Sequence, residues 1–310
     1  MGKWTLTIGT VIVIASAMGL WLNAIKNGNE FPKAPVSRYI TPQDQFVEVD
    51  GATIRVRQEG PIDGTPLILL HGFTYSLETW DGWAEELATS YRVIRYDLLG
   101  HGLTGPDKRK RYTPHQRADF LASVMDALGI EKANLAGNSL GGLVAWRFAA
   151  QNPDRVEKLI LIAPAAYPIN GVTDDPAPIP PTIDQFMRYA PDSGVRISLE
   201  LLYGDSSLVT NDRVALAGHM MKSAENGEAF IDHLEAFTLP NPTADLAKII
   251  APTLIMWGRS DGFIPPTHAA MMRDAIPNAE LALYSGIGHL PQEEAPIRTV
   301  ADAKRFLEMK

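Results

Sequence analysis

Along most of the chain, short apolar runs of strand length alternate with longer stretches in which apolar positions recur every three or four residues. Residues 46–49 and 53–58 alternate apolar and polar side chains around Asp50-Gly51, which predicts an antiparallel hairpin. Further strand-like runs lie at 66–70, 92–96, 133–137, 158–163, 252–258 and 280–285. Helical patterns between such runs are typical of parallel sheets covered on both faces. We therefore predict an α/β fold: a mostly parallel central sheet with an antiparallel leading edge and helices on both faces.

One long segment interrupts this alternation. Residues 165–242 include a proline-rich stretch, DDPAPIPP, and continue with several short helical patterns rich in Met, Phe, Leu and Tyr. Structureless loops of this length are rare in compact domains. We therefore expect residues 165–242 to form a helical cap inserted after the sixth strand, and residues 46–164 and 243–310 to form the core.

The N-terminus carries an uncharged apolar segment, Thr5 to Ile25. At a rise of about 1.5 Å per residue, a helix of this length spans the roughly 30 Å core of a bilayer. Lys3 precedes the segment, which favours an N-terminus inside and the rest of the chain exported. We expect residues 1–26 to be a membrane anchor that holds a periplasmic or extracellular domain.

Two other interpretations of this segment remain open. Ala15-Ser16-Ala17 offers a signal-peptidase site, and cleavage there predicts a secreted protein. A core helix that is buried on all sides is the third interpretation. The polar, proline-containing residues 27–45 that follow are expected to be a tether without regular structure.

Composition excludes several classes of function. The 310-residue chain has a net charge of −8 and its one basic run, KRKR at 108–111, is short, so we expect no nucleic-acid partner. The absence of cysteine excludes disulfides, thiolate metal sites and a cysteine nucleophile.

A glycine-flanked serine marks the first candidate for chemistry. Gly137-Asn138-Ser139-Leu140-Gly141 fits the G-x-S-x-G pattern and lies between a strand pattern and a helix pattern. A sharp strand-to-helix turn exposes the serine hydroxyl at the carboxyl edge of the sheet, and larger side chains at Gly137 or Gly141 would clash. The alternative is that Ser139 only caps the helix.

A serine hydroxyl needs a base, and the base needs an orienting acid. His289 follows the last predicted strand and Asp261 follows the preceding one, so both are expected at the edge that carries Ser139. The order Ser, Asp, His also fits this arrangement. Asp261 could instead cap the following helix.

An oxyanion hole is the remaining requirement. His71-Gly72-Phe73 forms a turn after the third strand, where it can direct the Phe73 amide at a reacting carbonyl. The Leu140 amide would be the second donor. We expect His71 to hold this loop by hydrogen bonds without transferring a proton.

Taken together, these segments resemble the α/β-hydrolase family, in its serine-nucleophile branch with a cap domain. The resemblance covers the chain from about Phe46 and rests on HG (71–72), DLLGHGLTGPD (97–107), GNSLGG (137–142), GRSDGFIP (258–265) and GIGHLPQEEAP (286–296). It implies Ser139 as nucleophile, Asp261 as triad acid and His289 as base. GNSLGG resembles the corresponding motif of carbon–carbon hydrolases of aromatic degradation, which usually have tryptophan where this chain has Leu290.

The expected activity is hydrolysis of a carboxylic ester or lactone of a small-to-medium apolar substrate through an acyl-enzyme, without metal or organic cofactor. Apolar cap residues could line the acyl pocket: Phe186, Met187, Tyr189, Leu202, Tyr203, Met220, Met221 and Phe237. A carbon–carbon hydrolase is the first alternative, for which Arg188 or Arg196 would bind a substrate carboxylate. A lyase or perhydrolase with the same triad and a non-catalytic binding protein on a hydrolase fold are the others.

Overall fold

The computed structural model describes residues 36–309. The predicted anchor, residues 1–26, lies outside the described residues. Within 36–309, no helix combines the length and the apolar character needed to cross a bilayer.

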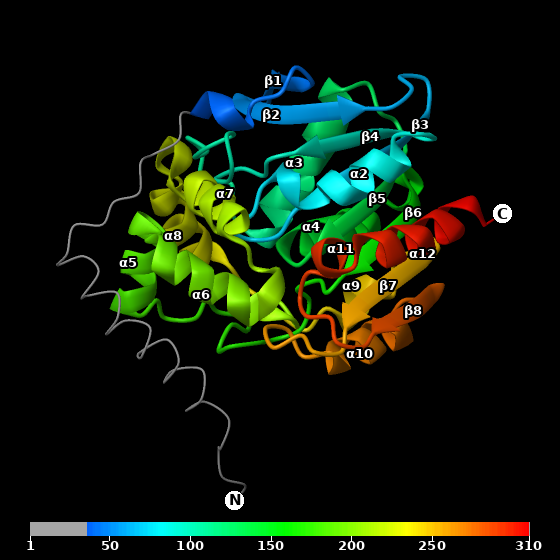
Figure 1. Ribbon diagram of the computed structural model, residues 1–310. Helices are drawn as coiled ribbons and strands as arrows, with labels where there is room; N and C mark the ends of the chain where they lie inside the picture. Colours follow the sequence, from blue (N-terminus) through cyan, green and yellow to red (C-terminus); the bar gives the residue numbers. More distant parts are fainter. Residues whose placement is uncertain (1–35, 310) are drawn as a thin grey trace, which may run out of the picture.

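Eight strands form one sheet in the order β1-β2-β4-β3-β5-β6-β7-β8 (Figure 1). The strands are β1 (Asp44–Val49), β2 (Ala52–Glu59), β3 (Thr65–Leu70), β4 (Tyr91–Tyr96), β5 (Ala133–Asn138), β6 (Val156–Ile162), β7 (Thr253–Gly258) and β8 (Ala279–Tyr284). β1 pairs with β2 and β2 with β4 in antiparallel fashion, and all other neighbours are parallel. The predicted fold class is confirmed: a mostly parallel sheet with an antiparallel leading edge.

Helices cover both faces of this sheet. The core helices are α2 (Asp81–Leu87), α3 (Pro114–Ala127), α4 (Leu140–Gln151), α9 (Thr243–Leu246), α10 (Thr267–Ala275), α11 (Pro291–Glu294) and α12 (Pro296–Glu308). Buried residues of α3, α4 and α10 form one hydrophobic cluster with the sheet. Residues of α2 and α12, including Trp83 and Phe306, form a second cluster on the opposite face. Burial of apolar side chains on both faces explains why the central strands have no polar alternation.

Local sequence signals fix several boundaries. α3 begins after Thr113, whose hydroxyl accepts a hydrogen bond from the Gln116 amide in a capping box, and Pro114 occupies the first helical position. The 3-10 helix η2 (Leu77–Trp80) leads directly into α2.

The leading edge starts earlier than the sequence pattern suggests. The 3-10 helix η1 (Val36–Tyr39) and the first residues of β1 lie within the segment expected to be an unstructured tether. Asp44 explains the earlier start, because its buried carboxylate accepts hydrogen bonds from Arg55 at 2.9 Å and Arg57 at 2.7 Å on the neighbouring strand. Burial raises the pKa of Asp44, but these bonds outweigh it and hold that pKa below its ordinary value.

Between β6 and β7 the chain leaves the sheet and forms the cap. Its helices are α5 (Pro181–Tyr189), α6 (Asp192–Leu202), α7 (Asn211–Lys222) and α8 (Asn226–Ala236), with η4 (Ser206–Leu208) and η5 (Ser223–Glu225) between them. The 3-10 helix η3 (Pro153–Arg155) lies outside the cap, between α4 and β6. Figure 1 shows the four cap helices gathered at one end of the sheet. A third hydrophobic cluster joins them to core residues that include Tyr75 and Leu290.

Candidate active site

Ser139 lies in a strained turn between β5 and α4. Its backbone has φ 53° and ψ −115°, a conformation that a residue with a side chain rarely adopts. The neighbouring backbone explains the two glycines: a Cβ on Gly137 would lie 2.3 Å from the Gly141 carbonyl oxygen, and one on Gly141 would lie 2.1 Å from the Leu70 carbonyl oxygen. This turn therefore admits only glycine at both positions.

The Ser139 hydroxyl does not cap α4. The side chain makes no capping hydrogen bond, although Ser139 occupies the N-cap position. Leu140 is the first residue of the helix, so its amide has no acceptor within the helix and lies at the positive end of the helix dipole. A capping role for Ser139 therefore explains neither its strained backbone nor the position of its hydroxyl.

Asp261 is held by donors on both carboxylate oxygens. Oδ1 accepts hydrogen bonds from the amides of Phe263 at 2.8 Å and Ile264 at 2.9 Å. Oδ2 accepts one from the Trp257 indole at 3.1 Å and lies 2.8 Å from Nδ1 of His289. Because an ionised carboxylate only accepts hydrogen bonds, His289 donates from Nδ1 and its Nε2 is left as an acceptor.

The His289 ring is buried, and its backbone is tied to two different parts of the molecule. The His289 amide donates to the Leu202 carbonyl at 2.7 Å, and the His289 carbonyl accepts from Nδ2 of Asn138 at 3.1 Å. Nε2 has no hydrogen-bond partner in the part of the chain that the structure describes. Ser139 and His289 line the same cavity, without a hydrogen bond between the hydroxyl and Nε2. Such contacts often form only when substrate is bound.

The loop after β3 packs directly on this turn. A Cβ on Gly72 would lie 3.3 Å from the Ser139 Cβ, so Gly72 allows the loop to approach the serine closely. In the part of the chain described, the Phe73 amide has no backbone acceptor. His71 is fully buried, accepts a hydrogen bond from the Leu98 amide at Nε2 and contacts the Gly72 carbonyl through Nδ1. Burial lowers the pKa of His71 to about 3, so its ring is neutral and holds the loop in place.

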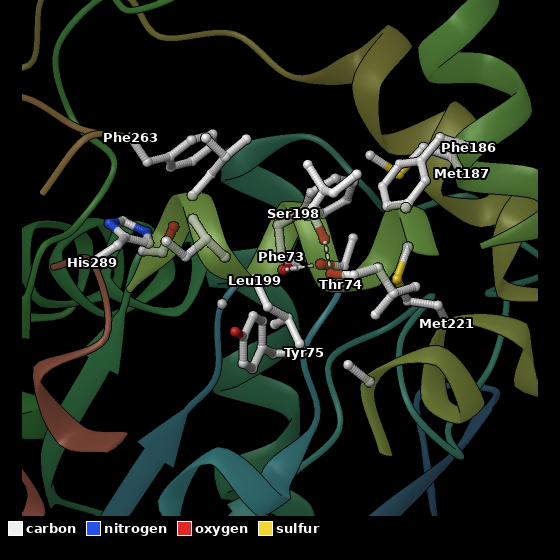
Figure 2. A pocket seen from close by; sticks show the side chains of 18 of the residues that line it. Phe73, Thr74, Tyr75, Phe186, Met187, Ser198, Leu199, Met221, Phe263 and His289 are labelled. Carbon is white, nitrogen blue, oxygen red and sulfur yellow. Dashed lines mark hydrogen bonds between the residues drawn. The ribbon is translucent and has the colours of Figure 1, made fainter. Parts of the chain in front are cut away.

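A cavity of about 280 Å³ lies between this edge and the cap. Figure 2 shows His289 and Phe263 at one end and Phe186, Met187 and Met221 at the other. Two hydroxyls of its wall have local acceptors: the Thr74 hydroxyl donates to the Phe73 carbonyl and the Ser198 hydroxyl donates within α6. The buried Tyr75 hydroxyl has no partner among the described residues. No lysine or arginine side chain is among the described residues that line it.

The two cap arginines considered for carboxylate binding have other partners. Arg188 pairs with Asp184 and Glu228, and Arg196 bonds to the Val209 carbonyl. Neither lines the cavity. Their sequence positions gave no sign of this, because both lie on helices whose orientation depends on tertiary packing.

The apolar cap residues separate into two groups. Phe186, Met187, Leu202 and Met221 line the cavity. The others point elsewhere: Tyr189 is exposed, Tyr203 bonds to Glu293, Met220 is buried outside the cavity, and Phe237 packs against the core. The cavity wall also contains residues that the sequence pattern did not single out: Ile183, Val195, Ile197, Leu199, Leu201 and Phe263.

Aromatic rings connect the cap to the loop after β3. Phe73 stacks on His233 of α8 with ring centroids 4.7 Å apart, and His101 packs against Phe73 at 5.6 Å. Arg117 lies 3.2 Å from the His233 ring. Burial, and then the charge of Arg117, hold the pKa values of His233 and His101 well below the ordinary value.

A polar cluster closes the opposite side of the cap. Glu293 is partly buried and bonds to Tyr203 and Arg213 of the cap and to Thr79 of the core. Burial raises the pKa of Glu293.

Over residues 36–309, no three acidic or histidine side chains are grouped as metal ligands.

Beyond the cavity wall, the sequence pattern did not single out two residues that hold the Asp261–His289 pair: Trp257, which bonds to Asp261, and Asn138, which bonds to the His289 loop. Asn138 had a signal, since it directly precedes the serine. Trp257 had a weaker one: it lies on β7, four residues before Asp261.

Comparisons with known proteins bear on the family and the fold. The sequence profile of the alpha/beta hydrolase family matches residues 67–303. The 2-hydroxymuconate semialdehyde hydrolase of Pseudomonas sp. (strain CF600) is 30% identical over 270 residues, which cover 84% of this chain and 93% of that protein. The meta-cleavage product hydrolase from Pseudomonas fluorescens IP01 superposes with a TM-score of 0.74 at 25% identity, over 85% of this chain and 97% of that one.

A bacterial membrane phospholipase A shares the fold over more of the chain. It has a TM-score of 0.72 at 23% identity and covers 97% of both chains. The family profile and the full set of eight strands lead to one conclusion: this chain belongs to the alpha/beta hydrolase family.

Proposed function

We propose that this protein is a serine hydrolase that cleaves a carboxylic ester or lactone of an apolar substrate through an acyl-enzyme. One observation carries the proposal: Ser139 and the hydrogen-bonded Asp261–His289 pair lie together at one end of an apolar cavity. The Ser139 backbone is strained and its side chain does not cap the helix. A serine that served only the fold would need neither the strain nor the paired histidine.

In the first step, Nε2 of His289 takes the proton of the Ser139 hydroxyl while its oxygen attacks the carbonyl carbon. The negative charge that develops on the carbonyl oxygen is stabilised by the amides of Phe73 and Leu140. His289 then gives the proton to the leaving alkoxide, and the acyl group stays on Ser139 as an ester.

The second step repeats this chemistry with water. His289 takes a proton from water, the resulting hydroxide attacks the acyl carbonyl, and collapse of the intermediate returns the proton to Ser139. Asp261 stays ionised throughout and stabilises the imidazolium. Its two bonds from the amides of Phe263 and Ile264 hold the carboxylate in the orientation that this role requires.

The lining of the cavity supports an uncharged acyl group. A carboxylate moved into an apolar cavity without a cationic partner loses several kcal/mol of hydration. The relative from Pseudomonas sp. is named for a muconate, which is a carboxylate, and this keeps carbon–carbon hydrolysis as the second candidate. The lack of lysine and arginine among the described lining residues weighs against it here.

Two nitrophenyl esters of equal length test the proposal: one with a neutral six-carbon acyl chain and one that ends in a carboxylate. We expect turnover of the neutral ester, at least about 100-fold lower kcat/KM for the charged one, and loss of activity in S139A. S198A is the matched control and should keep its activity, because in the described part of the chain this cavity hydroxyl bonds only to the Val195 carbonyl of its own helix. A folded protein that hydrolyses no ester, or one that prefers the charged ester, would contradict the proposal.

Attachment to a membrane is a separate proposal that rests on the sequence of residues 5–25 alone. We propose that the full chain is anchored by this segment with its hydrolase domain exported. The full chain should sediment with membranes, and a chain that lacks residues 1–26 should not. Equal sedimentation of the two chains would overturn it.

A further inference from the structure

The Asp261 carboxylate has a donor that the Ser-His-Asp arrangement does not require. We propose that Trp257 is a positioning residue: its indole N–H holds Asp261 and limits how strongly that carboxylate raises the basicity of His289. This inference rests on the proposed function, because it concerns how readily His289 takes up the serine proton.

The geometry places the indole and the imidazole on the same oxygen. Oδ2 of Asp261 lies 3.1 Å from Nε1 of Trp257 and 2.8 Å from Nδ1 of His289. The two amide donors both go to the other oxygen. Among the described residues, only the indole therefore competes directly with His289 for the charge on Oδ2.

Trp257 is well placed to hold a fixed position. It lies on β7, its side chain is 0% exposed, and its N–H also contacts the Ile264 carbonyl at 3.3 Å. Ile264 in turn donates its amide to Asp261. The indole N–H thus contacts both Asp261 and Ile264, the two ends of the turn that carries the carboxylate. Because Trp257 is fully buried, solvent water does not compete with its N–H for the carboxylate.

Electrostatics gives the direction of the effect. A hydrogen bond to an ionised carboxylate stabilises the charge and reduces its interaction with other partners. Without the indole N–H, the negative charge on Oδ2 would interact more strongly with His289, and this interaction would stabilise the imidazolium form. His289 would then take up a proton at higher pH, and the acid limb of the kcat/KM profile would move in the same direction.

The first test is W257F, which removes the N–H and keeps an aromatic ring. W83F is the matched control: Trp83 is equally buried and donates from its indole to the Thr299 hydroxyl at 3.0 Å, on the other face of the sheet. The titration of the His289 ring is followed by NMR in the resting protein, with its signal among the seven histidines identified by its absence in H289Q.

We expect the titration midpoint of His289 to rise by about half a pH unit in W257F and to stay within error in W83F. No movement in W257F, or equal movement in both variants, would overturn the inference and leave Trp257 as a packing residue.

A second measurement does not depend on the folding of W257F. Incorporation of 5-fluorotryptophan at all six tryptophans keeps the shape of the side chain and makes the N–H a stronger donor. The His289 midpoint should then move to lower pH, and an unchanged midpoint would contradict the proposal. Since these titrations need no turnover, they separate this inference from the proposed function, whose failure would show as absent ester hydrolysis in the wild-type protein.

Discussion

The edge of the sheet and the cap meet at one cavity, but their residues are held by different forces. At the edge, Asp261 and His289 each make several directional hydrogen bonds, and Gly141 approaches the backbone of Leu70 too closely for any side chain. On the cap side, α5 and α6 present apolar side chains that contact one another without directional bonds. The comparison teaches that the edge demands particular residue types, whereas the cap demands only apolar volume.

The largest effect is expected at the base. H289Q should lower kcat by about 10⁴-fold with little change in stability, because the serine loses its proton acceptor. H268N is the matched control: His268 lies on α10 near Asp261 but packs against Tyr167. Its kcat should change less than about 3-fold. Similar losses of kcat in H289Q and H268N would contradict the role of His289 as the base.

A pair of glycine substitutions compares the two regions directly. G141A places a Cβ against the Leu70 carbonyl oxygen at 2.1 Å, where only backbone movement can make room. It should lower the free energy of unfolding by about 3 kcal/mol and reduce activity more than about 100-fold. Denaturant titration measures the free energy of unfolding, and ester turnover measures the activity.

The cap partner of this pair is G194A. Its Cβ would meet the Phe186 ring at 3.0 Å, and this ring belongs to a side chain that can rotate. Alanine also favours the helix by up to about 1 kcal/mol. We expect nearly unchanged stability and a shift of preference to shorter acyl chains. A loss of stability as large as that of G141A would mean that the cap is as rigidly specified as the edge.

The smallest predicted effect lies where the regions touch, at His233. Because burial and Arg117 keep its pKa well below 6.5, the folded protein holds this ring neutral. As the pH falls below about 6.5, the unfolded chain binds a proton there and the folded one does not, so stability present above that pH is lost on acidification. H233N should reduce this acid slope by at most about 1.4 kcal/mol per pH unit. The same substitution at the exposed His115 is the control, and an unchanged slope in H233N would contradict the prediction.

Much of the fold could be predicted because its signals are local. Apolar runs placed all eight strands. The bonds of Asp44 to β2 could not be predicted, because they join residues on different strands whose register depends on the whole sheet.

The candidate site divides in the same way. The meeting of Ser139, Asp261 and His289 followed from their positions at strand ends, which topology brings to one edge. Their catalytic roles remain predictions. The cap residues that face the cavity could not be chosen from the sequence, since a helix with apolar residues on several faces does not reveal which face is inward. Leu202 lines the cavity whereas Tyr203, the next residue, points to Glu293.

The central claim is that Ser139 forms an acyl-enzyme. The most direct measurement is mass spectrometry of protein quenched with acid during turnover of the neutral nitrophenyl ester, followed by proteolysis to locate the adduct. We predict one acyl group on the peptide that contains Ser139 and none in S139A. Ester hydrolysis that persists in S139A, or an acyl group on a different residue, would contradict the account.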